Sequence, residues 1–394
     1  MELERIQQAL QAEGLDGWLF YDFRFSNPIA YQVLGLSTGE MYTRRWFYFV
    51  PAQGEPRALI SAVESHVLHS LPGERHIYQT WQEMQETLRG LLQPGMRVAM
   101  EYSPMNAIPY ISRVDAGTVE LVRTTGAEVV SSANISQRFV AQLTGAQVMS
   151  HREASRLIMA AKDALFAQLG ADLQAGGPLD EYSVQQRFLA LMKQAGLNAP
   201  ELPIVAVNEH SGNPHYATSK SASSPIRRGD LILFDFWARL PEPRNSVYAD
   251  YTWMAFAGTR EEIPERQQAV FAVVRDARDA AIAFIRERLA AGERVEGREA
   301  DDVARGLIAR AGYGSYFVHR TGHSLGPLEH YNGANIDNFE TQDERVLLPN
   351  TCNSIEPGIY LPEFGVRSEV NLLIHEHDAE VTGTPAQMEI VPLL

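Results

Sequence analysis

Residues 231–236 read Leu-Ile-Leu-Phe-Asp-Phe, and the acidic residue in this run, Asp235, is unexpected in such apolar surroundings. The same combination recurs three times further along the chain, where Asp250, Glu356 and Glu369 stand in β-rich apolar contexts. Moving a carboxylate out of water into such a strand costs several kcal/mol unless a cation or good hydrogen-bond donors compensate. One such acid can pair with an arginine, but four acids require a stronger counter-charge.

A histidine among glycines lies between these acids. Residues 319–326 read His-Arg-Thr-Gly-His-Ser-Leu-Gly, and the glycines let backbone and side chains approach a shared centre closely. Four carboxylates and one imidazole form an oxygen-rich donor set, which suits manganese, zinc, cobalt or iron(II) better than copper or an iron–sulfur cluster. Five ligands carrying four charges are too many for one cation. The sequence therefore predicts two divalent metal ions, with manganese preferred and zinc, cobalt or iron as alternatives.

The order of these motifs resembles that of the pita-bread metallopeptidases, a family that includes methionine aminopeptidase, Xaa-Pro aminopeptidase and Xaa-Pro dipeptidase (prolidase). The order is Asp, Asp, Gly-His-x-x-Gly, Ile-Glu-Pro-Gly-Ile-Tyr and Val-Arg-x-Glu, and it covers about the C-terminal 250 residues. The resemblance implies an α+β pita-bread catalytic domain over residues 146–394, with a curved, mainly antiparallel sheet that sets the ligands on adjacent strands. The ligands that it implies for the dinuclear site are Asp235, Asp250, His323, Glu356 and Glu369.

The resemblance also implies a mechanism and further site residues. A metal-bridging hydroxide would attack the scissile carbonyl, and Glu356 would carry the proton to the leaving nitrogen. Three histidines match family positions that orient the substrate and donate to the developing oxyanion, namely His215, His319 and His330. Arg367 matches an arginine that proline-directed members use near the site, although neutralisation of neighbouring carboxylates explains it equally well.

Residues 1–145 alternate helical and strand patterns with short connections, which predicts a three-layer α/β domain. This part resembles the N-terminal domain of the proline-directed enzymes and of creatinase. The residues themselves indicate a structural role, whereas the resemblance implies roles in substrate access and dimerisation. At the start of the second domain, Ser150 and Glu153 have the spacing of a capping box, so we expect a helix to begin there and to end near Gly170.

Some positions depart from the family pattern. Asp235 and Asp250 lie 15 positions apart (250 minus 235), and the Pro-rich segment 240–246 lengthens the connecting hairpin. Trp237 replaces a glycine and is expected to narrow the pocket. Asn350 also replaces a glycine, and asparagine accepts the left-handed conformation that such a turn requires. The remaining histidines without a partner pattern are expected at the surface, and these are His76, His151 and His210.

Composition excludes several classes of function. The 394 residues include 34 basic and 49 acidic side chains, which gives a net charge of −15 and argues against nucleic-acid or anionic-membrane partners. The single Cys352 excludes an intrachain disulfide and is expected as a small strand residue. Because we find neither a signal-like apolar core nor a membrane-length apolar stretch, we expect a cytoplasmic protein.

The leading hypothesis is a dinuclear metallopeptidase that hydrolyses the Xaa-Pro bond at peptide N-termini or in Xaa-Pro dipeptides. Its partners would be the peptide substrate and, by resemblance, a second copy of the chain in a homodimer. Two alternatives stay open: a catalytically silent peptide-binding protein with the same fold, and a creatinase-like hydrolase of another small C–N bond. The complete ligand set favours the peptidase.

Overall fold

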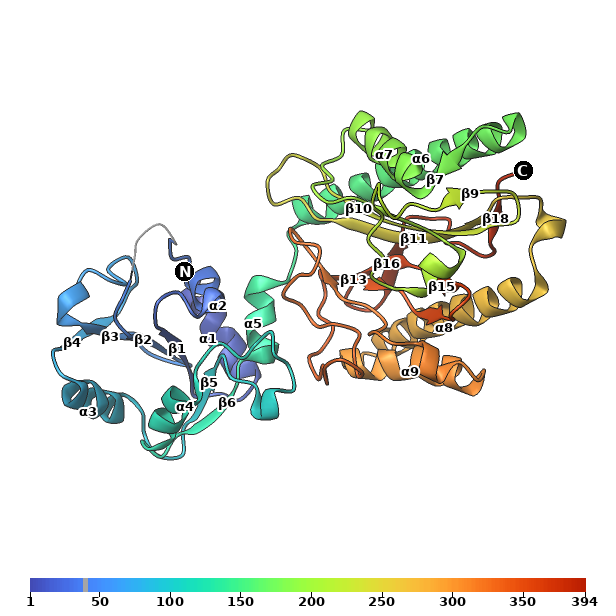
Figure 1. Ribbon diagram of the computed structural model, residues 1–394. Helices are drawn as coiled ribbons and strands as arrows, with labels where there is room; N and C mark the ends of the chain where they lie inside the picture. Colours follow the sequence, from blue (N-terminus) through green and yellow to red (C-terminus); the bar gives the residue numbers. More distant parts are fainter. Residues whose placement is uncertain (38–41) are drawn as a thin grey trace. The chain divides into compact units, whose positions relative to one another are not determined.

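The computed structural model describes residues 1–37 and 42–394, and it divides into two compact units, residues 1–140 and 141–394 (Figure 1). The sequence placed the domain boundary after residue 145. The structural division lies between Val140 and Ala141, directly after the last helix of the first unit.

The first unit is built on a six-stranded sheet in the order β4-β3-β2-β1-β5-β6. Its central strand, β1, is buried at all six positions, as expected for a strand covered on both faces. The strands are β1 (Gly17–Asp22), β2 (Trp46–Pro51), β3 (Arg57–Ser61), β4 (Glu74–Tyr78), β5 (Arg97–Met100) and β6 (Glu128–Ser131). The helices are α1 (Leu3–Ala12), α2 (Pro28–Leu34), α3 (Trp81–Leu91), α4 (Ala116–Arg123) and α5 (Ala133–Val140).

Two separate hydrophobic clusters cover the faces of this sheet. Helices α1, α2 and α5 pack on the face that carries Trp18 and Tyr48, whereas α3 and α4 pack on the face that carries Leu19 and Phe47. Consecutive residues of a strand point to opposite faces, so Trp18 and Leu19 belong to different clusters. The first unit is therefore the three-layer α/β domain that the sequence predicts (Figure 1).

The second unit combines four long helices with short, curved sheets. Its helices are α6 (Gly145–Ala175), α7 (Glu181–Gln194), α8 (Glu265–Ala290) and α9 (Gly297–Arg310). Its strands are β7 (Leu179–Asp180), β8 (Ile204–Val207), β9 (Pro225–Ile226), β10 (Leu231–Ala238), β11 (Ala249–Phe256), β12 (Ser324–Leu325), β13 (Cys352–Ile355), β14 (Gly358–Tyr360), β15 (Gly365–Arg367), β16 (Val370–Ile374), β17 (Ala379–Thr382) and β18 (Val391–Pro392). Among the described strands of this unit, all named pairs except β11–β18 are antiparallel.

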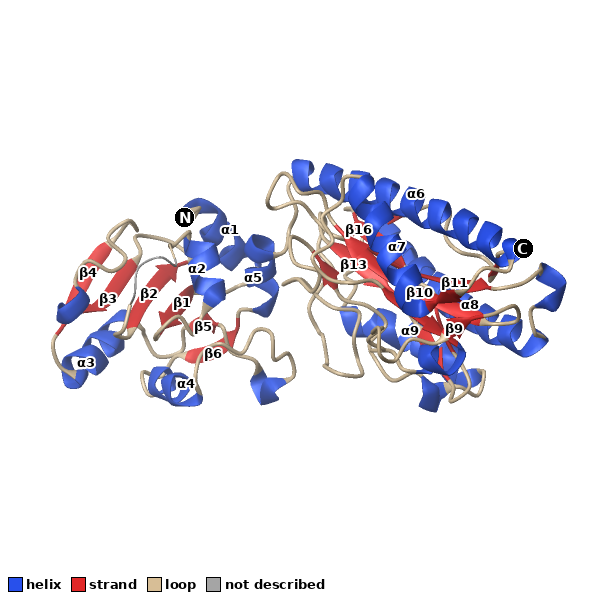
Figure 2. Cartoon of the chain, turned by 45° about the horizontal axis from the view of Figure 1, so that its top comes forward, coloured by secondary structure: helices blue, strands red, loops and turns tan. Residues whose placement is uncertain are grey.

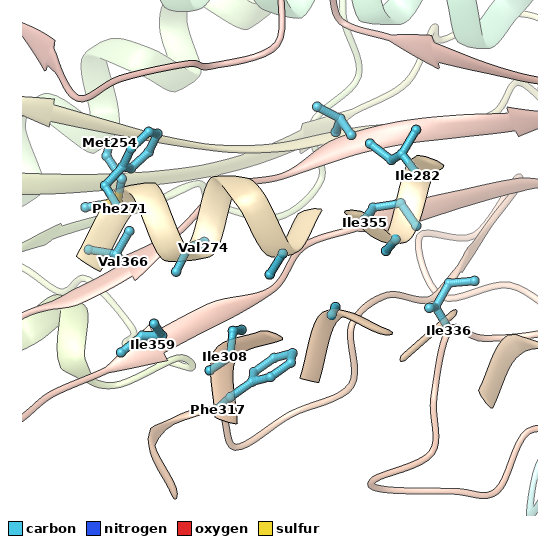
Figure 3. Close-up of a cluster of buried hydrophobic side chains, with 14 of the residues drawn as sticks. Met254, Phe271, Val274, Ile282, Ile308, Phe317, Ile336, Ile355, Ile359 and Val366 are labelled. Atoms are coloured by element: carbon cyan, nitrogen blue, oxygen red, sulfur yellow. The ribbon is translucent and has the colours of Figure 1, made fainter. Parts of the chain in front are cut away.

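The strands that carry the predicted ligands lie between two helix pairs. Helices α6 and α7 pack on one side of β10 and β11, and α8 and α9 pack on the other (Figures 1 and 2). Figure 3 shows the hydrophobic cluster on the side of α8 and α9, which includes Val274 of α8, Ile308 of α9, Ile355 of β13 and Val366 of β15. This double cover removes the strands from water, so acidic residues on them need compensation from within the protein.

Two expectations about helix α6 and its histidine are wrong. The helix begins at Gly145 rather than Ser150, because Thr144 and Gln147 form the capping box, and it continues to Ala175. Gly170 does not end it but allows close packing, since a Cβ there would lie 2.4 Å from the Leu393 carbonyl oxygen. His151 is fully buried, and its ring lies 2.7 Å from the Tyr248 carbonyl and 2.8 Å from Thr382 Oγ1.

The expectations for Asn350 and Cys352 are confirmed. Asn350 has a φ of 63°, so it adopts the left-handed conformation at the turn before β13. Cys352 is a buried residue of β13. Within residues 1–37 and 42–394, none of the helices combines the length and the apolar character that a membrane crossing needs.

Candidate metal centre

The first two predicted ligands lie on one face of a hairpin. Asp235 of β10 pairs with Thr252 of β11, and Asp250 of β11 pairs with Trp237 of β10. Residues two apart on a strand, and residues directly opposite on its neighbour, point to the same face. Asp235, Trp237, Asp250 and Thr252 therefore share one face, and the lengthened hairpin does not disturb their register.

The other three predicted ligands stand one residue outside short strands, and not within them as the sequence predicts. His323 precedes β12, Glu356 follows β13 and Glu369 precedes β16. Ser354 connects two of them, because its Oγ accepts from the His323 amide at 2.9 Å and donates to Glu356 Oε1 at 3.1 Å. Gly322 permits this approach, since a Cβ at that position would lie 2.0 Å from the Ser354 carbonyl oxygen.

Two side-chain contacts join the β10–β11 hairpin to the segment that carries Glu369 and Asn371. Asn371 of β16 accepts from the Asp250 amide at 2.9 Å and donates to the Asp250 carbonyl at 2.5 Å, so its amide copies the pattern of a strand partner. Thr252 Oγ1 donates to Glu369 Oε2 at 2.9 Å. These bonds hold Asp250 and Glu369 side by side.

The donor atoms converge on a position that fits a metal ion. Ligand atoms of Asp250, His323 and Glu369 all lie within 4.8 Å of one another, and His323 Nε2 is 3.4 Å from Glu356 Oε1. Glu369 Oε1 is buried and accepts no hydrogen bond, which leaves a charged oxygen uncompensated by the described protein groups. His323 Nδ1 lies 3.3 Å from the Ser324 carbonyl, which favours a proton on Nδ1 and leaves the Nε2 lone pair for a ligand bond. The donor set therefore fits divalent cations.

Burial and mutual repulsion shift the pKa values of the acids in this cluster. Burial and the neighbouring carboxylates raise the pKa values of Asp250 and Glu369 well above the usual range. Burial also raises the pKa of Asp235, to about 6, although Arg367 opposes the shift. Burial acts in the same direction on Glu356, but the neighbouring His323, His319 and Arg367 outweigh it and lower its pKa. Glu356 is therefore the acid of the cluster that ionises most readily.

Arg367 lies within the cluster and pairs with one of the predicted ligands. Its Nη2 forms an ion pair with Asp235 Oδ2, its Nε donates to Thr252 Oγ1 at 2.8 Å, and its Nη1 donates to Tyr360 OH at 3.0 Å. Of the two roles expected for Arg367, neutralisation of a carboxylate is the one that these contacts display.

The three additional histidines line the same cavity in different environments. His319 Nε2 lies 2.6 Å from Tyr360 OH, and burial lowers the His319 pKa to about 4, so its ring is neutral. The ring of His330 stacks on that of His323 with 3.9 Å between centroids. His215 is exposed. His210, which the sequence placed at the surface without a partner, lies 2.8 Å from the buried carboxylate of Glu181.

The cavity over the cluster has a volume of about 390 Å³, which suits a small peptide segment. Trp237 forms part of its wall, as expected from its place on the shared face. The lining residues are Glu201, Ile204, Pro214, His215, Asp235, Trp237, Asp250, His319, Arg320, His323, Glu329, His330, Glu340, Glu356, Arg367 and Glu369.

Sequence reasoning missed several residues of the site. Thr252 stands two positions after Asp250, so the alternation of a strand could have placed it on the same face. Tyr360 ends the quoted Ile-Glu-Pro-Gly-Ile-Tyr run, and Glu329 directly precedes His330. Asn371 gave no local signal, because its partner lies 121 residues away.

Comparison with known proteins finds similar sequences and similar folds. The Xaa-Pro dipeptidase of Pyrococcus furiosus is 33% identical over 202 residues, 51% of this chain and 52% of that protein, so the match spans about half the relative's length. The Xaa-Pro dipeptidase of Lactobacillus delbrueckii subsp. lactis is 27% identical over 351 residues, 88% of this chain and 86% of that protein. Among solved structures, a dipeptidase from Pyrococcus horikoshii OT3 is 25% identical, with a TM-score of 0.56 and 100% of both chains covered.

A family model covers most of the second unit. Residues 150–376, which include every predicted ligand and all three additional histidines, match the model described as metallopeptidase family M24. With more than half of its length in this match, and with the ligand atoms of Asp250, His323 and Glu369 gathered at one buried position, the chain belongs to metallopeptidase family M24.

Proposed function

We propose that this chain is a dinuclear metal-dependent peptidase that hydrolyses the bond between an N-terminal residue and proline. The observation that carries the proposal is the uncompensated oxygen Glu369 Oε1, buried beside Asp250 and His323. An unpaired buried carboxylate oxygen is too costly to keep unless a ligand completes it. The names of the relatives, Xaa-Pro dipeptidases, support proline as the residue after the scissile bond.

Five residues would hold the two metal ions: Asp235, Asp250, His323, Glu356 and Glu369. When bound, such ions activate water at neutral pH and polarise the carbonyl that is attacked. The lowered pKa keeps the Glu356 carboxylate ionised, so that it would be available to accept a proton, and Ser354 Oγ holds its Oε1 in place. The same carboxyl group would then deliver the proton to the leaving proline nitrogen.

The remaining site residues would bind and orient the substrate. His319, neutral and hydrogen-bonded to Tyr360, would keep a fixed ring orientation in the cavity wall. His215 and His330 would offer ring N–H donors to substrate carbonyl oxygens. Arg367 would act mainly on Asp235, whose negative charge it balances.

A metal add-back experiment tests the proposal. The chain is stripped with a chelator, dialysed, and assayed with Xaa-Pro peptides in the presence of manganese, zinc or cobalt. We expect release of the N-terminal residue only after metal is restored, and no cleavage of matched Xaa-Ala peptides. Cleavage by the stripped chain, or absence of cleavage with every metal, contradicts the proposal.

The two alternative functions predict other outcomes in the same experiment. A catalytically silent peptide-binding protein would hold less than one equivalent of metal under metal-replete conditions. A creatinase-like hydrolase would leave Xaa-Pro peptides intact and act on another small C–N bond. The intact donor set argues against both, and metal analysis together with a substrate panel distinguishes them.

Three further properties stay proposals. The first unit would contribute to substrate access and dimerisation, the chain would form a homodimer, and it would act in the cytoplasm without nucleic-acid or membrane partners. Sedimentation analysis of the full chain tests the dimer. Fractionation of cells that produce the chain tests the location.

A further inference from the structure

Glu329 is an acidic residue of the cavity to which none of the predictions assigns a role. Its loop is held at both ends, because the Gly326 carbonyl accepts from the Tyr248 amide at 3.0 Å and the Tyr331 amide donates to the Ser324 carbonyl at 2.8 Å. One Glu329 carboxylate oxygen and ring nitrogens of His323 and His330 all lie within 4.8 Å of one another. The fold therefore fixes this carboxylate beside the proposed reaction centre.

The charges that line the cavity are unequal. Among the residues that the structure describes, seven acidic residues and two arginines line it. Four of the acids are the proposed metal ligands, so bound metal ions would compensate them. Glu201, Glu329 and Glu340 remain outside that set; Glu340 pairs with Arg320, whereas Glu329 Oε1 lies 3.5 Å from His330 Nε2.

Both arginines of the lining are already engaged. Arg367 forms an ion pair with Asp235 and is almost completely buried. The Arg320 backbone amide and Nε donate to Glu340 Oε1 at 3.0 and 3.2 Å. Among the described residues that line the cavity, neither guanidinium is left without a carboxylate partner.

A substrate that ends at proline brings another negative charge into this cavity. In an Xaa-Pro dipeptide the carboxylate belongs to the residue directly after the scissile bond, so it lies about 4 Å along the chain from the reacting carbonyl. It must therefore enter the cavity together with that carbonyl. Inside the cavity Glu329 repels that carboxylate, because like charges interact strongly where water is partly excluded. When the peptide continues beyond proline, the same position carries a neutral amide.

We propose that Glu329 is a specificity-determining residue that disfavours a free carboxylate on the proline, so that the substrates are peptides extending beyond proline and not Xaa-Pro dipeptides. The inference rests on the proposed peptidase function and names its substrate class. The α-ammonium group of the peptide is common to both kinds of substrate, so the discrimination depends on the group that follows proline.

A matched pair of compounds tests the inference on the metal-loaded full chain. Ala-Pro and Ala-Pro amide differ in a single charge and hardly in size. We expect kcat/KM to be about tenfold higher for the amide, equivalent to about 1.4 kcal/mol, with the difference mainly in KM. In Glu329→Gln the ratio should fall below about threefold, whereas Glu329→Asp should largely keep it. Raising the ionic strength should weaken the preference of the original chain, because salt screens the repulsion.

A control variant and several contrary outcomes complete the test. Glu376→Gln removes one exposed carboxylate outside the cavity and should leave the ratio unchanged. Equal or better cleavage of Ala-Pro, or an unchanged ratio in Glu329→Gln, overturns the inference while the peptidase proposal stands. Loss of bound metal from Glu329→Gln overturns it too, because Glu329 would then be a ligand. If neither compound is cleaved with any metal, the peptidase proposal fails and the inference fails with it.

Discussion

Both units of the chain bury a glutamate, but the two carboxylates differ in their hydrogen-bond partners. In the first unit Glu101 is fully buried and accepts from Trp18 Nε1 and Asn27 Nδ2, each at 2.6 Å. In the second unit Glu369 is also buried, yet none of the described residues forms a hydrogen bond with its Oε1. Burial raises the pKa of both carboxyl groups, but neighbouring carboxylates add to the shift at Glu369 alone.

This difference separates a structural acid from one prepared for a ligand. A buried acid whose oxygens meet neutral donors is stable as the fold stands. A buried acid that faces other acids is destabilised by repulsion between the negative charges, and a bound cation would compensate this repulsion. Exposure alone does not distinguish the two residues, since both are buried. What distinguishes Glu101 from Glu369 is which atoms surround each carboxylate oxygen.

The largest expected effect follows from removing a proposed ligand. Asp250→Asn keeps the side-chain shape but removes a charge, so we expect bound metal to be lost and kcat/KM for Xaa-Pro peptides to fall more than about 100-fold, beyond the range typical of residues that only support ligands. Metal analysis and peptide kinetics measure both effects. Glu376→Gln is the matched control and should keep metal and rate. Full metal content in Asp250→Asn would contradict the assignment.

A second prediction concerns His151, which is buried as a neutral ring. Burial lowers its pKa to about 4 in the folded chain, from an ordinary value of 6.5. Below pH 6.5 the unfolded chain takes up a proton that the folded chain refuses, so the unfolding free energy should decrease from pH 6.5 towards pH 4, by up to about 3 kcal/mol. Denaturant titrations across this range measure it. His151→Gln should reduce this slope, whereas His377→Gln, at an exposed position, should keep it.

Metal removal should affect the second unit selectively. Because metal binds the folded site, a free concentration of 100 times Kd should stabilise that unit by about 2.7 kcal/mol, and chelation should remove this amount. Proteolysis or hydrogen exchange that follows the two units separately measures the change. The first unit, whose buried acids are satisfied by protein donors, should be unaffected. Equal destabilisation of both units would contradict the inference that only the second unit contains buried acids that need a metal ion.

The smallest effect is expected where the buried acid is already satisfied. In Glu101→Gln one side-chain amide N–H must face the N–H of Trp18 or Asn27, which leaves donors unpaired and should cost about 1–3 kcal/mol of unfolding free energy. Metal content should stay unchanged. Urea denaturation and metal analysis of the same preparation test this. Loss of metal from Glu101→Gln would mean that the two acids do not differ in kind.

Much of the architecture was accessible from sequence because its signals are local. Apolar runs such as residues 231–236 mark strands, and acids within them mark positions that need compensation. Local signals also mislead when two of them compete. Ser150 and Glu153 have the same spacing as Thr144 and Gln147, and the helix begins at the earlier pair, which caps its first turn.

The parts of the site that could not be predicted depend on long-range contacts. His151 looks like a surface residue of a polar helix, but its ring partners are 97 and 231 residues away. Thr252 and Glu369 meet across 117 residues. The order of motifs identified the proposed ligands, whereas the hydrogen bonds that hold them in place follow from the way the sheets pack.

The side-chain amide of Asn371 has a consequence for how metal enters. Since it binds both the N–H and the C=O of Asp250, and since Glu369 stands two residues before it, the separation of these two acids is set by covalent geometry and hydrogen bonds within the chain. The relative position of these two proposed ligands is thus set without a metal ion. We therefore expect metal binding to require little backbone reordering around Asp250 and Glu369.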